Sequence, residues 1–413
     1  MHPPSYYIGM FKIRENTLVM AAVGHFSADF FAGLLPILMA QLSVTFGLSN
    51  KEIGFAVVAY TFSSALSQPV FGHLGDRFGG RLVAAAGIAW IAVWMAIAGF
   101  APNYYILVGS FILAGLGSGA FHPQGAVSAV SKSKKGSGTS IFFFGGRLGF
   151  TAAPLLGGVM FASLGPSAMG LASIFGLIVA FGIWKSFPAR GAVKPKESTD
   201  ASISPVHWLA QVSLLALIGF VVSQGLRSGV NETYTTYLPK LYLDMGLTPI
   251  QYGLLASIFV AGSSIGSLVG GFLADRWNKK WIISSSILLA VPVMYAFIHS
   301  GPHTRLILAL ATGGLLSIAF TPALLIAQEL MPNRLSFITG LTMSFLFICN
   351  ALATTLTGVL ADTYGLAQVL AAATGLLAIA FVFSLLVPDR LGATSSANVT
   401  PQRAPSESDA PVL

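Results

Sequence analysis

The stretch that decides the fold reads Gly72-His73-Leu74-Gly75-Asp76-Arg77, and a related stretch follows 199 positions later as Gly271-Phe272-Leu273-Ala274-Asp275-Arg276. The same shift places Phe121-His122-Pro123 on Phe320-Thr321-Pro322, and a shift of 200 places Gly158 and Gly165 on Gly358 and Gly365. Duplication over this length in an apolar chain indicates two membrane bundles with the same orientation, which meet at a central site.

The composition places the chain in a lipid bilayer. Apolar residues make up 54% of its 413 positions and charged residues 9%, whereas a soluble domain carries about a quarter charged residues. Long continuous apolar runs favour helices over the alternating strands of a barrel. We therefore predict an all-α membrane protein with two six-helix bundles, an architecture typical of transporters. The twelve predicted spans cover 17–46, 53–74, 82–100, 105–130, 139–164, 168–187, 207–243, 249–273, 281–300, 305–330, 335–363 and 366–387.

A polar segment separates the two predicted bundles. We place an N-terminal segment at 1–16, the bundles at 17–187 and 207–387, a linker at 188–206 and a disordered tail at 388–413. Basic residues predominate in the loops on the side of both termini; on the other side the predicted loops and span ends carry only Lys51, Lys240 and Arg305. The positive-inside rule therefore predicts that both termini are cytoplasmic. The net charge of +8 reflects this topology rather than binding to nucleic acid.

Two carboxylates occupy matching positions in the predicted bundles. Asp29 precedes Pro36 by seven residues, as Glu232 precedes Pro239. His25 lies four residues before Asp29 and shares its helix face. Ionisable groups at membrane depth are costly unless they are paired or wetted, and a buried carboxylate can exchange a proton near neutral pH. We predict that these ionisable residues couple proton movement to transport; the alternative is a static buried ion pair.

His122 is a further candidate for proton coupling, because an imidazole titrates near physiological pH. It precedes Pro123, which removes a backbone donor and is expected to loosen the helix there. A satisfied packing histidine is the alternative. Gln124 follows and is a candidate for substrate binding, whereas the repeat partner of His122 is the uncharged Thr321.

Arg147 and Arg227 are the arginines within the predicted spans, and a guanidinium does not lose its charge. They could hold an anionic substrate or neutralise the carboxylates. Arg227 shares a helix face with Gln224 and Asn231, which we add to the substrate-binding candidates. A pair between Arg227 and Glu232 would need a break in their common helix, so pairing across helices is expected.

The repeated loops have the charge pattern of gates. Tight turns with alternating charges can hold bundle ends together in one state and release them in another. Positive-inside anchors are the alternative. Glu329 closes the tenth span on the same side and could bind a loop arginine. The predicted gating residues are Gly72, Asp76, Arg77, Arg81, Gly271, Asp275, Arg276, Glu329 and Arg334.

These features resemble the major facilitator superfamily, in their spans, 6+6 repeat and gate loops. Within it the chain is most similar to the fosmidomycin-resistance family of bacterial inner-membrane exporters. The similarity rests on His25-x3-Asp29, Gln68-Pro69-x2-Gly72, Gly117-x3-Phe121-His122-Pro123, Gly145-Gly146-x2-Gly149, Gln328-Glu329-Leu330-x-Pro332-x-Arg334 and Ala361-Asp362. The resemblance implies proton-driven efflux of a small polar or anionic compound or drug. Arg147 replaces an asparagine usual in that family, which bears on the substrate rather than the fold.

The leading prediction is thus a proton-coupled antiporter, and the main alternative is an uptake permease for an organic anion. A membrane sensor and an intramembrane enzyme are remoter alternatives. We expect no cofactor beyond the proton gradient and no metal, because a metal site built from His25, Asp29 and His122 would need further convergent ligands. The expected partners are a small-molecule substrate, protons and lipid, and the expected state is a monomer.

Overall fold

The computed structural model describes residues 5–130, 137–188, 213–329 and 335–387. Across these ranges every regular element is a helix, which confirms the predicted all-α class. The helices are α1 (Ser5–Phe46), α2 (Asn50–Phe78), α3 (Gly80–Gly99), α4 (Tyr104–Val130), α5 (Ser137–Leu164), the 3-10 helix η1 (Gly165–Ala168), α6 (Met169–Ser186), α8 (Leu214–Asp244), α9 (Pro249–Ala274), α10 (Lys279–Ile298), α11 (Pro302–Ile318), α12 (Phe320–Glu329), α13 (Leu335–Tyr364) and α14 (Leu366–Ser384). The predicted tail lies outside the described residues, as does the linker beyond Pro188.

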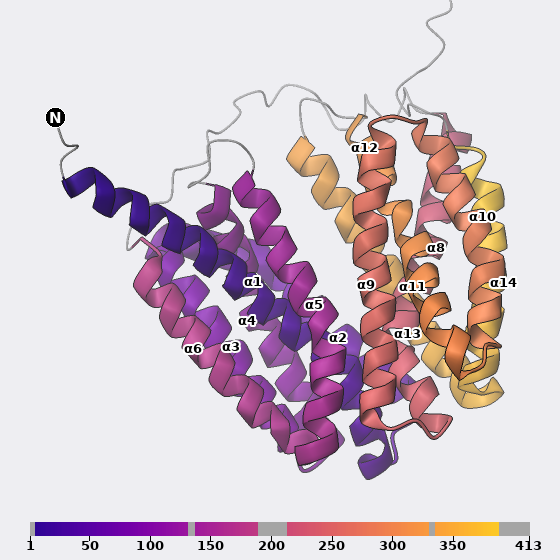
Figure 1. Ribbon diagram of the computed structural model, residues 1–413, viewed down its shortest axis with the longest axis horizontal. Helices are drawn as coiled ribbons and strands as arrows, with labels where there is room; N and C mark the ends of the chain where they lie inside the picture. The colour runs from indigo at the N-terminus through magenta and orange to yellow at the C-terminus, as the bar shows by residue number, and fades with distance from the viewer. Residues whose placement is uncertain (1–4, 131–136, 189–212, 330–334, 388–413) are drawn as a thin grey trace, which may run out of the picture.

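The helices form two groups that lie side by side, α1–α6 and α8–α14 (Figure 1). In the first group α1 packs against α5, and α4 packs against α2 and α3. In the second group α9 packs against α11, and α8 packs against α13 and α14. Each group therefore has its own interior, as two duplicated bundles require.

Within the described residues, 11 helical segments are long and apolar enough to cross a membrane. One of them, Ser140–Ser186, is 47 residues long and contains both α5 and α6. The chain turns between these helices in η1, where Gly165 has a φ of 63°, in the left-handed region that glycine readily adopts.

The two bundles differ in the helix that the sequence predicts to be loosened, which is α4 in the first bundle and α11 with α12 in the second. Helix α4 runs without a break through Pro123, and a loosening of the helix there stays a prediction. The break occurs at the repeat-related position instead, where α11 ends at Ile318 and α12 begins at Phe320. Near this break, Arg227 donates from Nη1 to the carbonyl oxygen of Leu316 over 2.6 Å. A cation at a helix C-terminus satisfies carbonyls that the helix itself leaves free.

The two bundles bind each other through the helix ends remote from the N-terminus. Tyr252 Oη donates to Gln41 Oε1 over 3.0 Å, which joins α9 to α1. The backbone N–H of Leu155 donates to Ser257 Oγ over 2.8 Å, which joins α5 to α9. Toward the end at which the N-terminus lies, the helices of the two bundles diverge (Figure 1). The bundle seam is therefore closed on the face opposite the N-terminus.

Close packing of α5 on α1 gives a test of the fold. A Cβ atom at Gly149 would lie 2.2 Å from the carbonyl oxygen of Phe26, whereas a Cβ atom at Gly109 on α4 would meet nothing within 4 Å. We expect Gly149→Ala to lower the stability of the purified protein by about 1–3 kcal/mol through overpacking. Gly109→Ala is the matched control and should leave stability unchanged or slightly higher. Equal melting temperatures for the two variants would contradict this packing.

Candidate functional site

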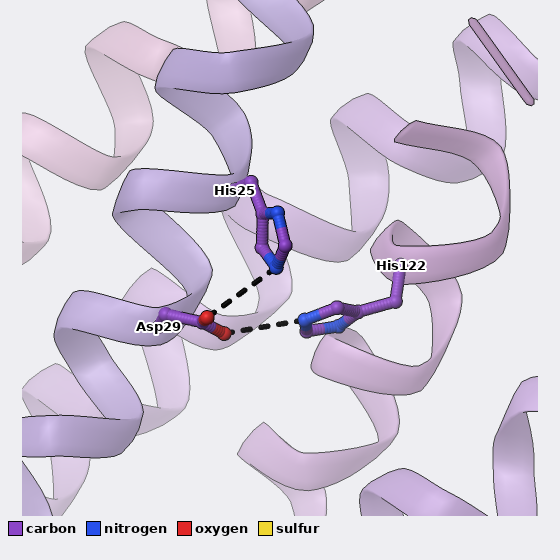
Figure 2. Close-up of side chains that lie close together, drawn as sticks. All are labelled: His25, Asp29 and His122. Atoms are coloured by element: carbon purple, nitrogen blue, oxygen red, sulfur yellow. Dashed lines mark hydrogen bonds and ion pairs between the residues drawn. The ribbon is translucent and has the colours of Figure 1, made fainter. Parts of the chain in front are cut away.

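Three of the predicted proton-coupling residues meet in one cluster, which we call the Asp29 cluster: His25, Asp29 and His122. Helix α1 carries His25 and Asp29 one turn apart, and α4 supplies His122 (Figure 2). His25 Nε2 lies 3.3 Å from Asp29 Oδ2, and His122 Nε2 lies 3.2 Å from Asp29 Oδ1. The two imidazole rings are perpendicular, with centroids 5.1 Å apart. The carboxylate is thus held between two rings, one on each oxygen.

The other nitrogen of each ring faces a backbone carbonyl. His25 Nδ1 lies 2.8 Å from the oxygen of Phe142, and His122 Nδ1 lies 2.8 Å from the oxygen of Ser118. A carbonyl oxygen can only accept, so each Nδ1 must carry the hydrogen. In its neutral form each ring therefore turns an unprotonated Nε2 toward Asp29.

This arrangement leaves the Asp29 cluster with two contacts that added protons can complete. With the carboxylate ionised and both rings neutral, two nitrogen lone pairs face two oxygen lone pairs and no hydrogen bond forms. One added proton satisfies one of the two contacts, and a second proton satisfies the other. Each added proton also raises the charge of the cluster by one, so the charge of the site depends on its proton occupancy.

The cluster is enclosed on the side of α5 but remains accessible to solvent. His25 is 5% exposed and stacks on Phe142 with centroids 4.1 Å apart, while the side chains of Asp29 and His122 are 26% and 25% exposed. A Cβ atom at Gly146 would lie 2.5 Å from His25 Nε2 and 2.6 Å from Asp29 Oδ2. The cluster therefore requires a residue without a side chain at this position of α5.

Arg147 follows Gly146 on α5 and brings a positive charge to the site. Its side chain is exposed, and it is attracted electrostatically to Asp29. In the part of the chain that the structure describes, Arg147 has no hydrogen-bond or ion-pair partner. A cation that is left without a partner beside a proton site is suited to bind an anionic group.

Glu232, the repeat partner of Asp29, does not join this cluster. It is partly buried on α8, and no described residue forms a hydrogen bond or ion pair with it. Each bundle therefore has a carboxylate at the matching position, but the histidine contacts surround Asp29 and not Glu232.

The remaining predicted substrate ligands are engaged with the protein itself. Arg227 is 3% exposed and donates to Gln224 Oε1 over 2.9 Å and to the carbonyl of Leu316, so it pairs with neither carboxylate, on its own helix or across helices. Helix α8 shows no break between Arg227 and Glu232. Gln124 is buried and donates to the carbonyl of Phe71, at the end of α2. A substrate role for these residues stays a prediction.

Asn231 is placed differently. Its Oδ1 is the acceptor for Ser263 Oγ at 3.5 Å, so it links α8 to α9 while remaining partly exposed. Its contact with substrate also stays a prediction.

The predicted gate loops lie at the end where the helices diverge. Asp76, Arg77, Asp275 and Arg276 are exposed there. Arg81 instead stacks on the Trp184 ring, 4.4 Å from its centroid.

Glu329 has a different partner from the expected one. It binds Lys279 Nζ over 3.0 Å, so the expectation of a loop arginine is wrong. Lys279, at the start of α10, is the ion-pair partner of Glu329 because α12 ends beside it. Arg334 lies outside the described residues, and the gating roles stay predictions.

Sequence reasoning did not identify the backbone carbonyls of Phe142 and Ser118 that orient the two rings. No residue type marks a carbonyl acceptor, so the sequence holds no signal for it. The paired glycines Gly145-Gly146 were a usable signal for the close approach of α5.

The Asp29 cluster is also where a metal ion could find ligands. Within the described ranges it is the one group of three histidine, cysteine or carboxylate ligand atoms that lie within 4.8 Å of one another. Backbone carbonyls on Nδ1 orient metal-binding histidines in the same way. Protons alone satisfy both contacts, so the geometry requires no metal.

Comparison with known proteins assigns the family. The model of the Major Facilitator Superfamily matches residues 21–342 and 220–408. The fosmidomycin resistance protein of Escherichia coli (strain K12) is 26% identical over 85% of this chain and 88% of its own. The nitrite extrusion protein of Bacillus subtilis (strain 168) is 28% identical over 60% of this chain and 62% of its own.

The fold agrees with this assignment. A crystal structure of a bacterial homologue of the human lysosomal transporter Spinster, in an inward-facing conformation, superposes with a TM-score of 0.77 at 14% identity, over 92% of this chain and 98% of that one. The chain belongs to the Major Facilitator Superfamily and is a membrane transporter, not an enzyme.

Proposed function

We propose that this protein is a proton-coupled transporter that exports a small polar or anionic compound by alternating access. The observation that carries the proposal is the Asp29 cluster, in which two contacts can each take up a proton. The names of its relatives support this choice, since one confers fosmidomycin resistance and another extrudes nitrite, an anion.

The proposal includes a topology of twelve crossings in two groups of six. Counting α5 and α6 as separate crossings, and α11 with α12 as one, gives this number from the described helices. The excess of basic residues on the side of the termini supports cytoplasmic termini in a bacterial inner membrane. The closed seam then lies on the outer face.

Protons and substrate compete for Asp29 in this proposal. A substrate that presents an N–H or O–H donor to the carboxylate replaces the protons shared with His25 and His122. The two ligands therefore exclude each other at Asp29. When the transporter binds substrate on one side of the membrane and protons on the other, it moves the two in opposite directions. A proton gradient then drives export.

Uptake of an organic anion on the same fold is the second candidate, and the position of Arg147 favours it. Protons bound at the Asp29 cluster neutralise the carboxylate that attracts the guanidinium and leave Arg147 to bind an anion. Protons and anion would then bind together and move in the same direction. The sign of the coupling therefore separates the two candidates.

Asp29→Asn should abolish gradient-driven transport while leaving folded protein in the membrane, because an amide cannot exchange protons with the two rings. The measurement is flux into inverted and right-side-out vesicles under an imposed pH gradient, with a panel of phosphonates, organic acids and drugs. Asp244→Asn is the control, since Asp244 pairs with Lys240 one turn away on the same helix. Wild-type accumulation by Asp29→Asn would exclude Asp29 from coupling.

Arg147→Gln should lower the transport of anionic substrates by about tenfold or more, because a hydrogen bond to a charged group is lost. Arg147→Lys keeps the charge and should retain part of the activity, although it loses the planar fork of donors. Anionic and cationic candidates are compared side by side in the same vesicles. Anion transport that is unchanged in Arg147→Gln, or a wild type that moves cations alone, contradicts the assignment of Arg147.

A further inference from the structure

The N-terminus of α2 is completed by a residue of the other bundle. Its first four backbone N–H groups have no partner within the helix. Two of the four are satisfied by a capping box, in which the N–H of the cap residue Ser49 donates to Glu52 Oε2 and Ser49 Oγ accepts from the N–H of Glu52. The two donors that remain, on Asn50 and Lys51, are left to a partner outside α2.

Asp362, near the end of α13, accepts both of these hydrogen bonds. The N–H of Asn50 lies 2.7 Å from Oδ1, and the N–H of Lys51 lies 3.1 Å from Oδ2. A carboxylate at a helix N-terminus gains from the charged hydrogen bonds and from the helix dipole. Each oxygen of Asp362 therefore binds one first-turn donor across the bundle seam.

The neighbouring residues bring α13 close enough for this contact. A Cβ atom at Gly358, one turn before Asp362, would lie 2.8 Å from the carbonyl oxygen of Asn50 and 2.9 Å from Lys51 Cα. Tyr237 Oη lies 3.0 Å from the carbonyl oxygens of both Asn50 and Thr354. The seam between α2 and α13 is thus closely packed around the carboxylate.

The repeat-related seam between α5 and α9 lacks this contact. At a shift of 199, Asn50 falls on Pro249, which has no backbone N–H, and at a shift of 200, Asp362 falls on Ala162. There, Gly158 packs directly on the carbonyl of Pro249, where a Cβ atom would lie 2.4 Å from the oxygen. One seam of the closed face is therefore held by a charged contact, and the other by apposed backbones and the hydrogen bond from Leu155 to Ser257.

We propose that Asp362 and the N-terminus of α2 form a latch that holds the face opposite the N-terminus closed. Opening that face separates α2 from α13 and gives the two N–H groups to water. The latch acts on the balance between the two conformations of the transporter, at a distance from the Asp29 cluster. It was not among the gating residues expected from the sequence; those of them that the structure describes lie on the opposite face.

The test measures how often the closed face opens in purified protein. Cys349 is the single cysteine of the chain, so Cys349→Ser gives a cysteine-free background. Ser257→Cys then places a reporter thiol at a buried position of the α5–α9 seam on the same face. The modification rate by a water-soluble maleimide, in detergent without substrate or gradient, reports the open fraction.

Asp362→Asn should raise the modification rate about tenfold, the factor expected when a hydrogen bond to a charged group is weakened. Asn50→Pro copies the residue found at Pro249, removes one donor at a position where helices accept proline, and should raise the rate about threefold. Because both variants act on one contact, their combination should raise the rate by less than the product of the single effects.

Asp244→Asn is the matched control, because it removes a carboxylate from the end of α8 that pairs within its own helix. Its modification rate should equal that of the parent. Parent-like rates in both Asp362→Asn and Asn50→Pro, or single effects that multiply in the double variant, would overturn the latch. If Asp362→Asn fails to fold, Asn50→Pro still tests the contact from the other bundle. The readout involves no proton coupling, so its result is independent of the proposed function.

Discussion

A carboxylate at membrane depth must be compensated, and Asp29 is compensated by two imidazoles whose orientation the backbone sets. Each ring donates Nδ1–H to a carbonyl, so Nε2 is left to face the carboxylate. The contacts are satisfied by added protons rather than by a permanent cation. The same arrangement that makes Asp29 tolerable in the bilayer is the basis of the proton coupling that we propose.

The surrounding helices serve this arrangement in different ways. Helix α5 approaches α1 through glycines, and at Gly146 its backbone leaves the space that His25 and Asp29 occupy. The next residue, Arg147, brings a positive charge that Asp29 attracts. In the second bundle, Arg227 donates to the carbonyl of Leu316 near the break between α11 and α12, so its guanidinium is engaged with the protein itself.

Much of this architecture could be predicted from the sequence, because apolar run length and repeated motifs are local or periodic signals. The predicted spans agree with the helices to within a few residues at most ends, and His25, Asp29 and His122 were identified from the cost of burying them. Side-chain contacts between helices were harder to predict from the sequence, since they depend on how the helices pack. Glu329 meets Lys279 rather than an arginine, and the helix break falls between Ile318 and Phe320 rather than at Pro123. The contact of Asp362 with α2 joins residues 312 positions apart, which no local pattern encodes.

Nitrogen-15 NMR of histidine-labelled protein in lipid nanodiscs reads the protons of the Asp29 cluster themselves, with His25 and His122 assigned from single-histidine variants. We expect Nδ1 of both rings to carry a hydrogen, because each is bound to a carbonyl. Asp29→Asn should change the Nε2 signals of both rings together, because both rings contact the same carboxylate. An unprotonated Nδ1 in either ring, or Nε2 signals that Asp29→Asn leaves unchanged, would contradict a shared proton site.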